Sequence, residues 1–227
     1  MDARPGMAIR LQFDRIPPGA QVGPHRHEVE TVVYVAAGEI AFEHGPGLSR
    51  HVTVRAGDVL YEPPFNEHVV RNDGAIDALA LVAAVDIDPQ RPVDDQPFSW
   101  RDSGDPVRRR EGARLMESPG IRHRVLMEPG DFGTRSFSVA EVELDPGAST
   151  GWHRHLESEH VVVVLEGRGT VRIGSLEEIL EPLRGVHVQM GLPHAITSTG
   201  RTRLRYYLCA TPAADRLTDR ERFAPPT

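Results

Sequence analysis

Lysine is absent from the 227-residue sequence, so all 26 basic residues are arginine. A chain without lysine cannot form a Schiff base with a carbonyl compound, anchor pyridoxal phosphate or build the usual phosphate-binding loop. Enzymes that depend on any of these three devices are therefore excluded.

Cysteine and long apolar runs are also scarce. Cys209 is the single cysteine and lies in the apolar run from Tyr206 to Ala210. The chain can therefore hold no internal disulfide and no cysteine-based zinc finger, and we expect Cys209 to be buried. No stretch approaches the about 18 apolar residues of a membrane span, and the N-terminus lacks the apolar segment of a signal peptide. We expect a cytoplasmic protein with no membrane partner.

Positive charge is not in excess. The 26 basic residues stand against 33 acidic ones, for a formal net charge of −7, and the chain has only 2 Trp, 4 Tyr and 7 Phe. A nucleic-acid-binding surface needs concentrated positive charge to release the counterions of the phosphates. We therefore expect no nucleic-acid partner.

Short segments with β-type alternation or many β-branched residues are abundant, and Gly, Pro, Asn and Asp separate them. Without a convincing helical period, this pattern predicts an antiparallel sandwich or barrel. The predicted strands are residues 8–16, 31–36, 39–43, 51–54, 58–61, 68–71 and 78–85, then 121–127, 135–143, 161–165, 170–173, 186–190 and 203–209. Between residues 86 and 120 apolar periodicity is weak, and after residue 212 we expect one short helix and a tail.

The two halves of the chain repeat each other. The tripeptide Pro18-Gly19-Ala20 recurs 128 positions later, and so does His25-Arg26-His27. Gly38 recurs as Gly167 and His68 as His194, at shifts of 129 and 126 positions. Landmarks that keep register this well predict a duplicated β domain.

Most histidines lie at or beside these landmarks. Residues i and i+2 of a strand point to the same face, so each His-x-His pair directs two imidazoles at one point, where a histidine from a neighbouring strand joins them. Three converging imidazoles are typical of a divalent transition metal site with open positions for substrate, water or oxygen. The predicted ligands are His25, His27 and His68 in the first half and His153, His155 and His194 in the second.

With these motifs the sequence resembles the cupin superfamily, and specifically its two-domain members, the bicupins. The first cupin motif is matched by Gly19, His25, His27 and Gly38, and again by Gly147, His153, His155 and Gly167. The second motif is matched by Gly57, Pro63, His68 and Asn72, with Phe65 in place of an inner glycine; in the second half only Gly191 and His194 remain, with Leu183, Gln189 and Ser198 in place of Gly, Pro and Asn.

The resemblance implies an all-β fold of two tandem cupin barrels, also called double-stranded β-helices or jelly rolls, each able to hold a metal in its mouth. It divides the chain into an N-terminal cupin domain (residues 1–86), a linker or arm (87–120), a C-terminal cupin domain (121–212) and a tail (213–227). We expect a homodimer, formed through exposed strand edges or through the arm.

The chain departs from the family where most cupins place a glutamate ligand. Thr31 and His160 stand there, and Glu30 and Glu159 come one residue earlier, so only one residue of each pair can face the barrel interior without a bulge. In the second half His160 is the favoured fourth ligand, and Glu159 is the alternative. The first barrel either binds metal through its three histidines alone or is a degenerate structural copy.

Three function classes follow for such a site. A dioxygenase with Fe(II), or with Mn, Ni or Cu, acting on a small oxygenated molecule is the favoured hypothesis. A redox-neutral isomerase, cyclase or decarboxylase with Zn or Mn is the alternative, and a non-catalytic small-molecule-binding bicupin stays open. Candidate site residues besides the ligands are Glu159 as a general base, Trp152 as a pocket wall, and Arg172 and Arg205 as partners for a substrate carboxylate.

Overall fold

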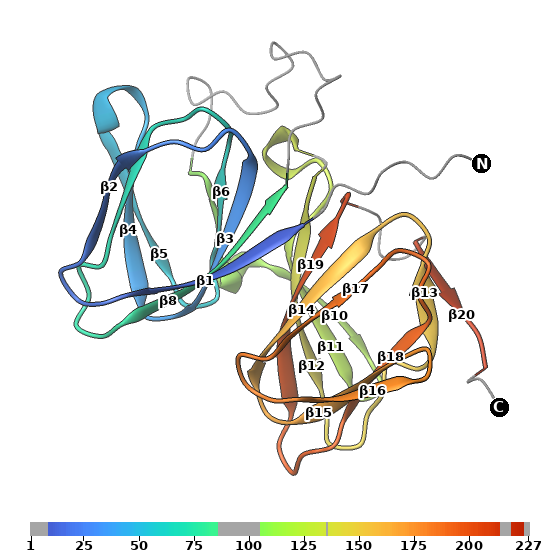
Figure 1. The fold of residues 1–227 in the computed structure, drawn as a ribbon. Helices are drawn as coiled ribbons and strands as arrows, with labels where there is room; N and C mark the ends of the chain where they lie inside the picture. The colour runs from blue at the N-terminus through green and yellow to red at the C-terminus, as the bar shows by residue number, and fades with distance from the viewer. Residues whose placement is uncertain (1–8, 86–104, 135, 214–218, 225–227) are drawn as a thin grey trace. The chain divides into compact units, whose positions relative to one another are not determined.

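The structure is a computed structural model that describes residues 9–85, 105–134, 136–213 and 219–224. Over these residues it is built almost entirely of antiparallel strands, with short 3-10 turns at η1 (Pro46–Leu48), η3 (Arg110–Gly112) and η4 (Asp131–Gly133) (Figure 1). The predicted all-β class with two tandem jelly-roll barrels is confirmed. No helix within the described ranges is long and apolar enough to cross a membrane.

The chain forms two compact units. The first comprises residues 1–112 together with 130–134, and the second comprises residues 113–129 and 135–227. The part of the predicted linker that is described is not free of structure. Strand β9 (Val107–Arg108) pairs with β6 of the first unit, and β10 (Arg114–Ser118) pairs with β11 of the second. Residues 87–104 lie outside the described residues.

Two sheets make the first unit, with strand orders β1-β8-β3-β6-β9 and β2-β7-β4-β5. Apolar and polar residues alternate along β1 and β5, as expected for strands with one face toward a core, whereas β3, β6 and β8 are apolar and buried over most of their length. The strands are β1 (Arg10–Ile16), β2 (Gln21–His25), β3 (Glu30–Ala37), β4 (Glu39–His44), β5 (Arg50–Arg55), β6 (Val59–Glu62), β7 (His68–Arg71) and β8 (Ala78–Val85).

The second unit repeats this plan with strand orders β10-β11-β12-β19-β14-β17 and β16-β15-β18-β13-β20. Its strands are β11 (Ile121–Met127), β12 (Ser138–Leu144), β13 (His153–His155), β14 (Glu159–Glu166), β15 (Gly169–Ile173), β16 (Leu176–Leu180), β17 (Gly185–Val188), β18 (His194–Ser198), β19 (Leu204–Thr211) and β20 (Arg220–Arg222). The prediction of a short helix in the C-terminal stretch is wrong for residues 220–222, which form a strand.

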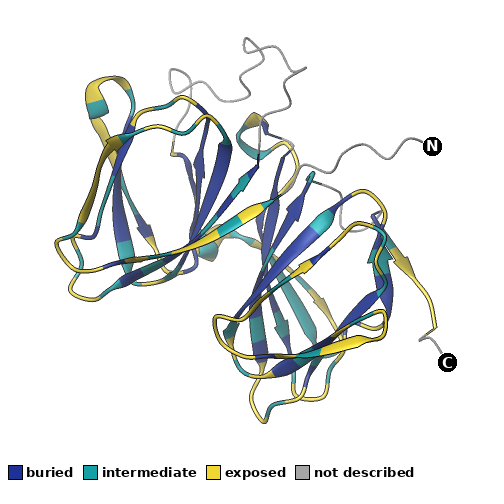
Figure 2. Ribbon diagram, in the orientation of Figure 1, coloured by how far each residue is buried: buried dark blue, intermediate teal, exposed yellow. Residues whose placement is uncertain are grey.

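The core of the second barrel is aliphatic. Buried residues from β12, β14 and β19 meet those of β15, β16 and β18, among them Val142, Val162, Val171 and Leu204. Figure 2 shows the buried residues concentrated on the strands and the exposed residues mainly in the connections. Cys209, predicted to be buried, is fully buried on β19.

Two equivalent turns in each unit need a left-handed backbone. Gly57 (φ 92°) and Leu183 (φ 66°) stand 126 positions apart and donate their N–H groups to Val35 and Val164 in the same way. Phe65 (φ 61°) and Gly191 (φ 78°) form the second pair. The turn geometry is therefore kept where the motif glycine is lost, with a non-glycine residue in a conformation that favours glycine.

Candidate metal centres

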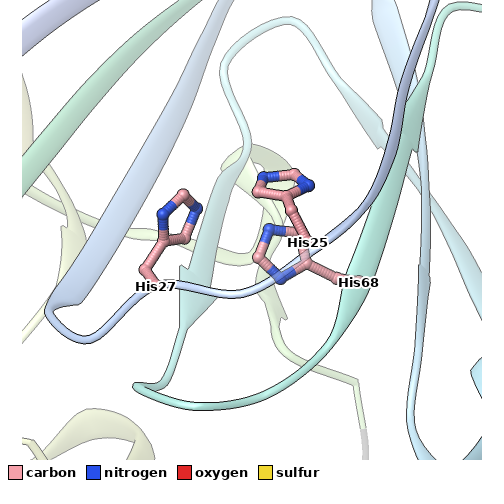
Figure 3. Close-up of side chains that lie close together, drawn as sticks. All are labelled: His25, His27 and His68. Atoms are coloured by element: carbon pink, nitrogen blue, oxygen red, sulfur yellow. The ribbon is translucent and has the colours of Figure 1, made fainter.

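The N-terminal centre consists of His25 at the end of β2, His27 just beyond it and His68 at the start of β7. Antiparallel pairing sets His25 opposite His68, which is why residues far apart in sequence meet. One ring nitrogen or more of each histidine lies within 4.8 Å of the others, and ring centroids are 4.3 to 5.1 Å apart. Figure 3 shows the three rings gathered at one point.

The C-terminal centre has the same construction. His153 and His155 on β13 face the interior together, and β18 pairs His194 opposite His153. The ring centroids of His153 and His194 are 4.2 Å apart, close to the 4.3 Å of His25 and His68. All three side chains are buried, and their ligand atoms again lie within 4.8 Å of one another.

Main-chain carbonyls orient two histidines of each centre. The Nδ1 atoms of His25 and His68 lie 2.9 and 3.0 Å from the carbonyl oxygens of Gly23 and Asn66. In the second unit His153 and His194 repeat this contact, at 2.9 and 3.0 Å from the carbonyls two residues upstream. A carbonyl accepts a hydrogen bond, so Nδ1 carries the proton and Nε2 keeps its lone pair.

The residues present fit a metal ion. His68 Nε2 is buried and has no hydrogen-bond partner among the described residues, as expected for an atom that would bind a metal ion. Burial lowers the pKa of His68 and of His194 to about 4, and also lowers the pKa of His27 and of His153. These four imidazoles are therefore neutral at neutral pH, which is the form that binds a metal.

Glu62 lies beside the N-terminal centre and was not predicted. It ends β6, is 4% exposed, and places Oε2 3.6 Å from His27 Nε2 and Oε1 3.7 Å from His68 Nε2. Burial, with a smaller contribution from Asp14, raises the pKa of Glu62 to about 8. Its place in the sequence, before Pro63 and far from the histidine pair, gave no signal that it would lie at this centre.

Asp219 has a comparable position at the C-terminal centre. Its carboxylate accepts hydrogen bonds from the backbone N–H groups of Leu156 and Glu157, at 2.8 and 2.5 Å, and from the hydroxyl of Ser158. Asp219 Oδ2 also lies 3.4 Å from His155 Nδ1. This aspartate was not predicted, because it belongs to the stretch expected to be a tail.

Arg220 is the second unpredicted residue of that barrel. The β13–β20 register pairs it with His155, so its side chain points to the same face. Its guanidinium donates to the Thr150 carbonyl at 2.7 Å, while its buried Nε has no hydrogen-bond partner among the described residues. Burial lowers the pKa of Arg220 to about 10, and its positive charge helps to lower the pKa of His153 and of His194.

The two residues considered for the fourth ligand of the C-terminal centre point to opposite sides of β14. His160 is buried, its ring centroid is 3.7 Å from that of His155, and its Nε2 is 3.0 Å from Ser158 Oγ. With His155 and Asp219 it forms a second buried group of possible ligands. Glu159 lies on the other face, where its carboxylate is 2.9 Å from His187 Nε2. The structure thus brings His160, but not Glu159, toward His155 of the C-terminal centre.

Of the remaining predicted residues, Trp152 is buried, whereas the two arginines face away from the barrel interior. Arg172 lies over the Trp152 ring, with its guanidinium carbon 5.5 Å from the ring centroid, and it pairs with Glu177 at 3.4 Å. Arg205 pairs with Glu166 at 3.1 Å and with Glu141 at 3.5 Å. On their strands these arginines alternate with core residues, so neither points toward the C-terminal centre.

Comparisons with known proteins relate both halves of the chain to one domain family. The family model described as a cupin domain matches residues 12–84 and 140–210. A tetracenomycin polyketide synthase protein of Streptomyces glaucescens is 31% identical over 93 residues, which are 41% of this chain and 62% of that protein. An oxalate-binding protein of Thermotoga maritima is 38% identical over 72 residues, 31% of this chain and 57% of that protein. The match thus spans less than two thirds of each of these relatives.

Solved structures resemble the whole two-unit chain. Oxalate decarboxylase of Bacillus subtilis, which has Mn(II) centres, superposes with a TM-score of 0.73 at 15% identity, over 95% of this chain and 71% of that one. A 7S globulin of Momordica charantia gives a TM-score of 0.72 at 17% identity, over 91% and 74%. Likeness at such identities shows the fold. With a cupin domain matched in each half, the chain belongs to the cupin superfamily as a two-domain member.

Proposed function

We propose that this bicupin is a metal-dependent enzyme with a divalent transition metal in each barrel, and that it acts on a small oxygenated molecule that carries a carboxylate. The observation that supports this most is the interior of the C-terminal barrel. There the imidazoles of His153, His155 and His194 converge, and the half-buried Arg220 is the cross-strand partner of His155. The oxalate-binding and oxalate-decarboxylating proteins among the relatives make a small carboxylate plausible as a substrate class.

Each residue has a distinct task in this proposal. A bound metal supplies Lewis acidity and open positions for a chelating substrate. His153, His155 and His194 hold it through neutral nitrogens, and so leave the ion more of its positive charge than a carboxylate would. Arg220 binds and orients the substrate carboxylate by charge-assisted hydrogen bonds, which are strong in a buried site. Val162 and Val164 line the same barrel and keep it dry.

Dioxygenase chemistry with Fe(II) remains the favoured reaction class, because an all-nitrogen site lined by apolar residues suits a chelated substrate together with dioxygen. A redox-neutral reaction such as decarboxylation or isomerisation is the second candidate. One comparison favours it: the Bacillus subtilis enzyme whose fold this chain shares is a decarboxylase with Mn(II) centres.

Metal analysis tests the first part of the proposal. Protein purified anaerobically without a histidine tag is expected to carry metal in both barrels, and a His153→Ala, His155→Ala double variant to lose half of it. His51→Ala is the matched control, because His51 is exposed on β5 and should leave the metal content unchanged. Unchanged metal content in the double variant contradicts the C-terminal centre.

Oxygen-electrode measurements with keto acids, diketones and catechols test the reaction class. A dioxygenase consumes oxygen with one of these compounds, and Arg220→Gln raises the KM for the carboxylate-bearing ones at unchanged metal content. Zinc as the native metal, with substrate turnover but no oxygen uptake, selects the redox-neutral class. Binding without turnover leaves the small-molecule-binding bicupin as the function.

A further inference from the structure

We propose that Glu62 provides a carboxylate ligand to the metal of the N-terminal centre, so that the two centres of this chain are chemically different. The carboxylate enters from β6, opposite the position on β3 where most cupins carry their glutamate and this chain has Thr31. The inference rests on the proposed function in one respect, that the N-terminal barrel binds a metal.

Distances place the carboxylate beside two of the three histidines. Its two oxygens lie 3.6 and 3.7 Å from the Nε2 atoms of His27 and His68, respectively. Two donors that bind one ion at about 2.1 Å are about 3.0 to 4.2 Å apart, depending on the angle between them. Both contacts fall in this range, and His68 Nε2 has no hydrogen-bond partner among the described residues.

Strand register explains how the carboxylate replaces the missing glutamate. Thr31 and Glu62 are direct cross-strand partners in the β3–β6 pair, so their side chains emerge side by side on one face. Thr31 Oγ1 is buried without a hydrogen-bond partner among the described residues. Glu30, the neighbouring glutamate, points to the opposite face, where the Thr134 hydroxyl donates to it at 2.5 Å.

The C-terminal barrel has an equivalent cross-strand pair, but there the residue with a donor side chain lies on the first strand of the pair. His160 and Val188 are the cross-strand partners in the β14–β17 pair, and they are equivalent to Thr31 and Glu62. In each barrel one residue of this pair carries a strong donor: Glu62 on the second strand in the N-terminal barrel, His160 on the first strand in the C-terminal barrel. Both barrels therefore have a donor side chain at this cross-strand position, supplied by β6 in the first barrel and by β14 in the second.

Charge distinguishes the two centres. A carboxylate among the ligands adds one negative charge and a hard oxygen donor to the N-terminal set. In the C-terminal barrel the buried carboxylate of Asp219 lies beside His155 Nδ1, outside the set of His153, His155 and His194, which supplies nitrogen donors alone. Carboxylate oxygen suits Mn(II) better than an all-imidazole set does. Mn(II) is therefore expected to fill the N-terminal centre first.

The test is a Mn(II) titration of the metal-stripped full-length chain, followed by electron paramagnetic resonance. Glu62→Gln is expected to weaken one of the two sites at least about 100-fold, because even loss of an outer-sphere partner costs about 10- to 100-fold. His25→Ala should remove the same site, and adding Glu62→Gln to it should cause no further loss. Glu30→Gln is the matched control, being an equally buried glutamate on the opposite face of the same sheet.

Glu62→Val provides a second variant, since Val188 is the natural residue at the equivalent position, and it should lose the same site. Wild-type Mn(II) affinity at both sites in the two Glu62 variants overturns the inference and leaves the proposed function standing. A wild-type chain that binds neither Mn(II), Fe(II) nor Zn(II) overturns the proposed function and the inference with it.

Discussion

Leu183 replaces a motif glycine, and its backbone conformation is expected to lower the stability of the fold. Its φ of 66° lies in the left-handed region, and its side chain is 51% exposed, so little apolar burial compensates the strain. We expect Leu183→Gly to raise the free energy of unfolding by about 0.5 to 1 kcal/mol in urea titrations, as relief of strain outweighs the flexibility of glycine. Val22→Gly, at a 46% exposed position of β2 without positive φ, should instead lower it by about 0.5 to 1 kcal/mol. Equal effects in the two variants would contradict the assignment of strain.

Strand β20 is the element that completes the C-terminal centre. It pairs with β13 and brings Asp219 within 3.4 Å of His155 Nδ1, where a carboxylate orients a ligand imidazole. We expect Asp219→Asn to weaken metal binding at this centre by about 10- to 100-fold in metal titrations, with the N-terminal centre unaffected. Glu221→Gln is the control, because Glu221 points outward and pairs with Arg154 at 2.6 Å. Identical affinities in the two variants would show that Asp219 has no part in orienting His155.

Which site residues the sequence predicts depends on whether their position is set within one strand or by the pairing of two strands. The His-x-His repeat predicts two clusters, because alternation along one strand is a local property, and the structure brings both together. Glu62, Asp219 and Arg220 gave no such signal. Their positions depend on which residues face each other across β3–β6 and β13–β20, and single-strand patterns do not encode that register. Arg172 and Arg205 illustrate the same point, since alternation alone left their faces open.

At the scale of the whole molecule, the exposed edge of β16 favours self-association. This strand lies at the edge of its sheet, and its residues Leu176 and Ile179 are 56% and 49% exposed to solvent. Exposed apolar side chains on an edge strand favour pairing with another chain, so we predict a homodimer with twice the 25.1 kDa mass in light scattering. Ile179→Lys should reduce the mass to that of one chain, whereas Ile76→Lys, at a 63% exposed residue outside the strands, should not. A wild-type mass of one chain at every concentration would refute the dimer.

The orientation of four candidate ligands by main-chain carbonyls bears on how this protein can change over evolution. The acceptors are the backbone oxygens of Gly23, Asn66, Gly151 and Leu192. Every amino acid carries this oxygen, so substitutions in the loops that keep the backbone path leave the imidazoles aimed as before. New substrate preferences can then arise by exchanging loop side chains around a fixed metal, and a protein engineer can randomise Asn66 and Leu192 without dismantling either centre.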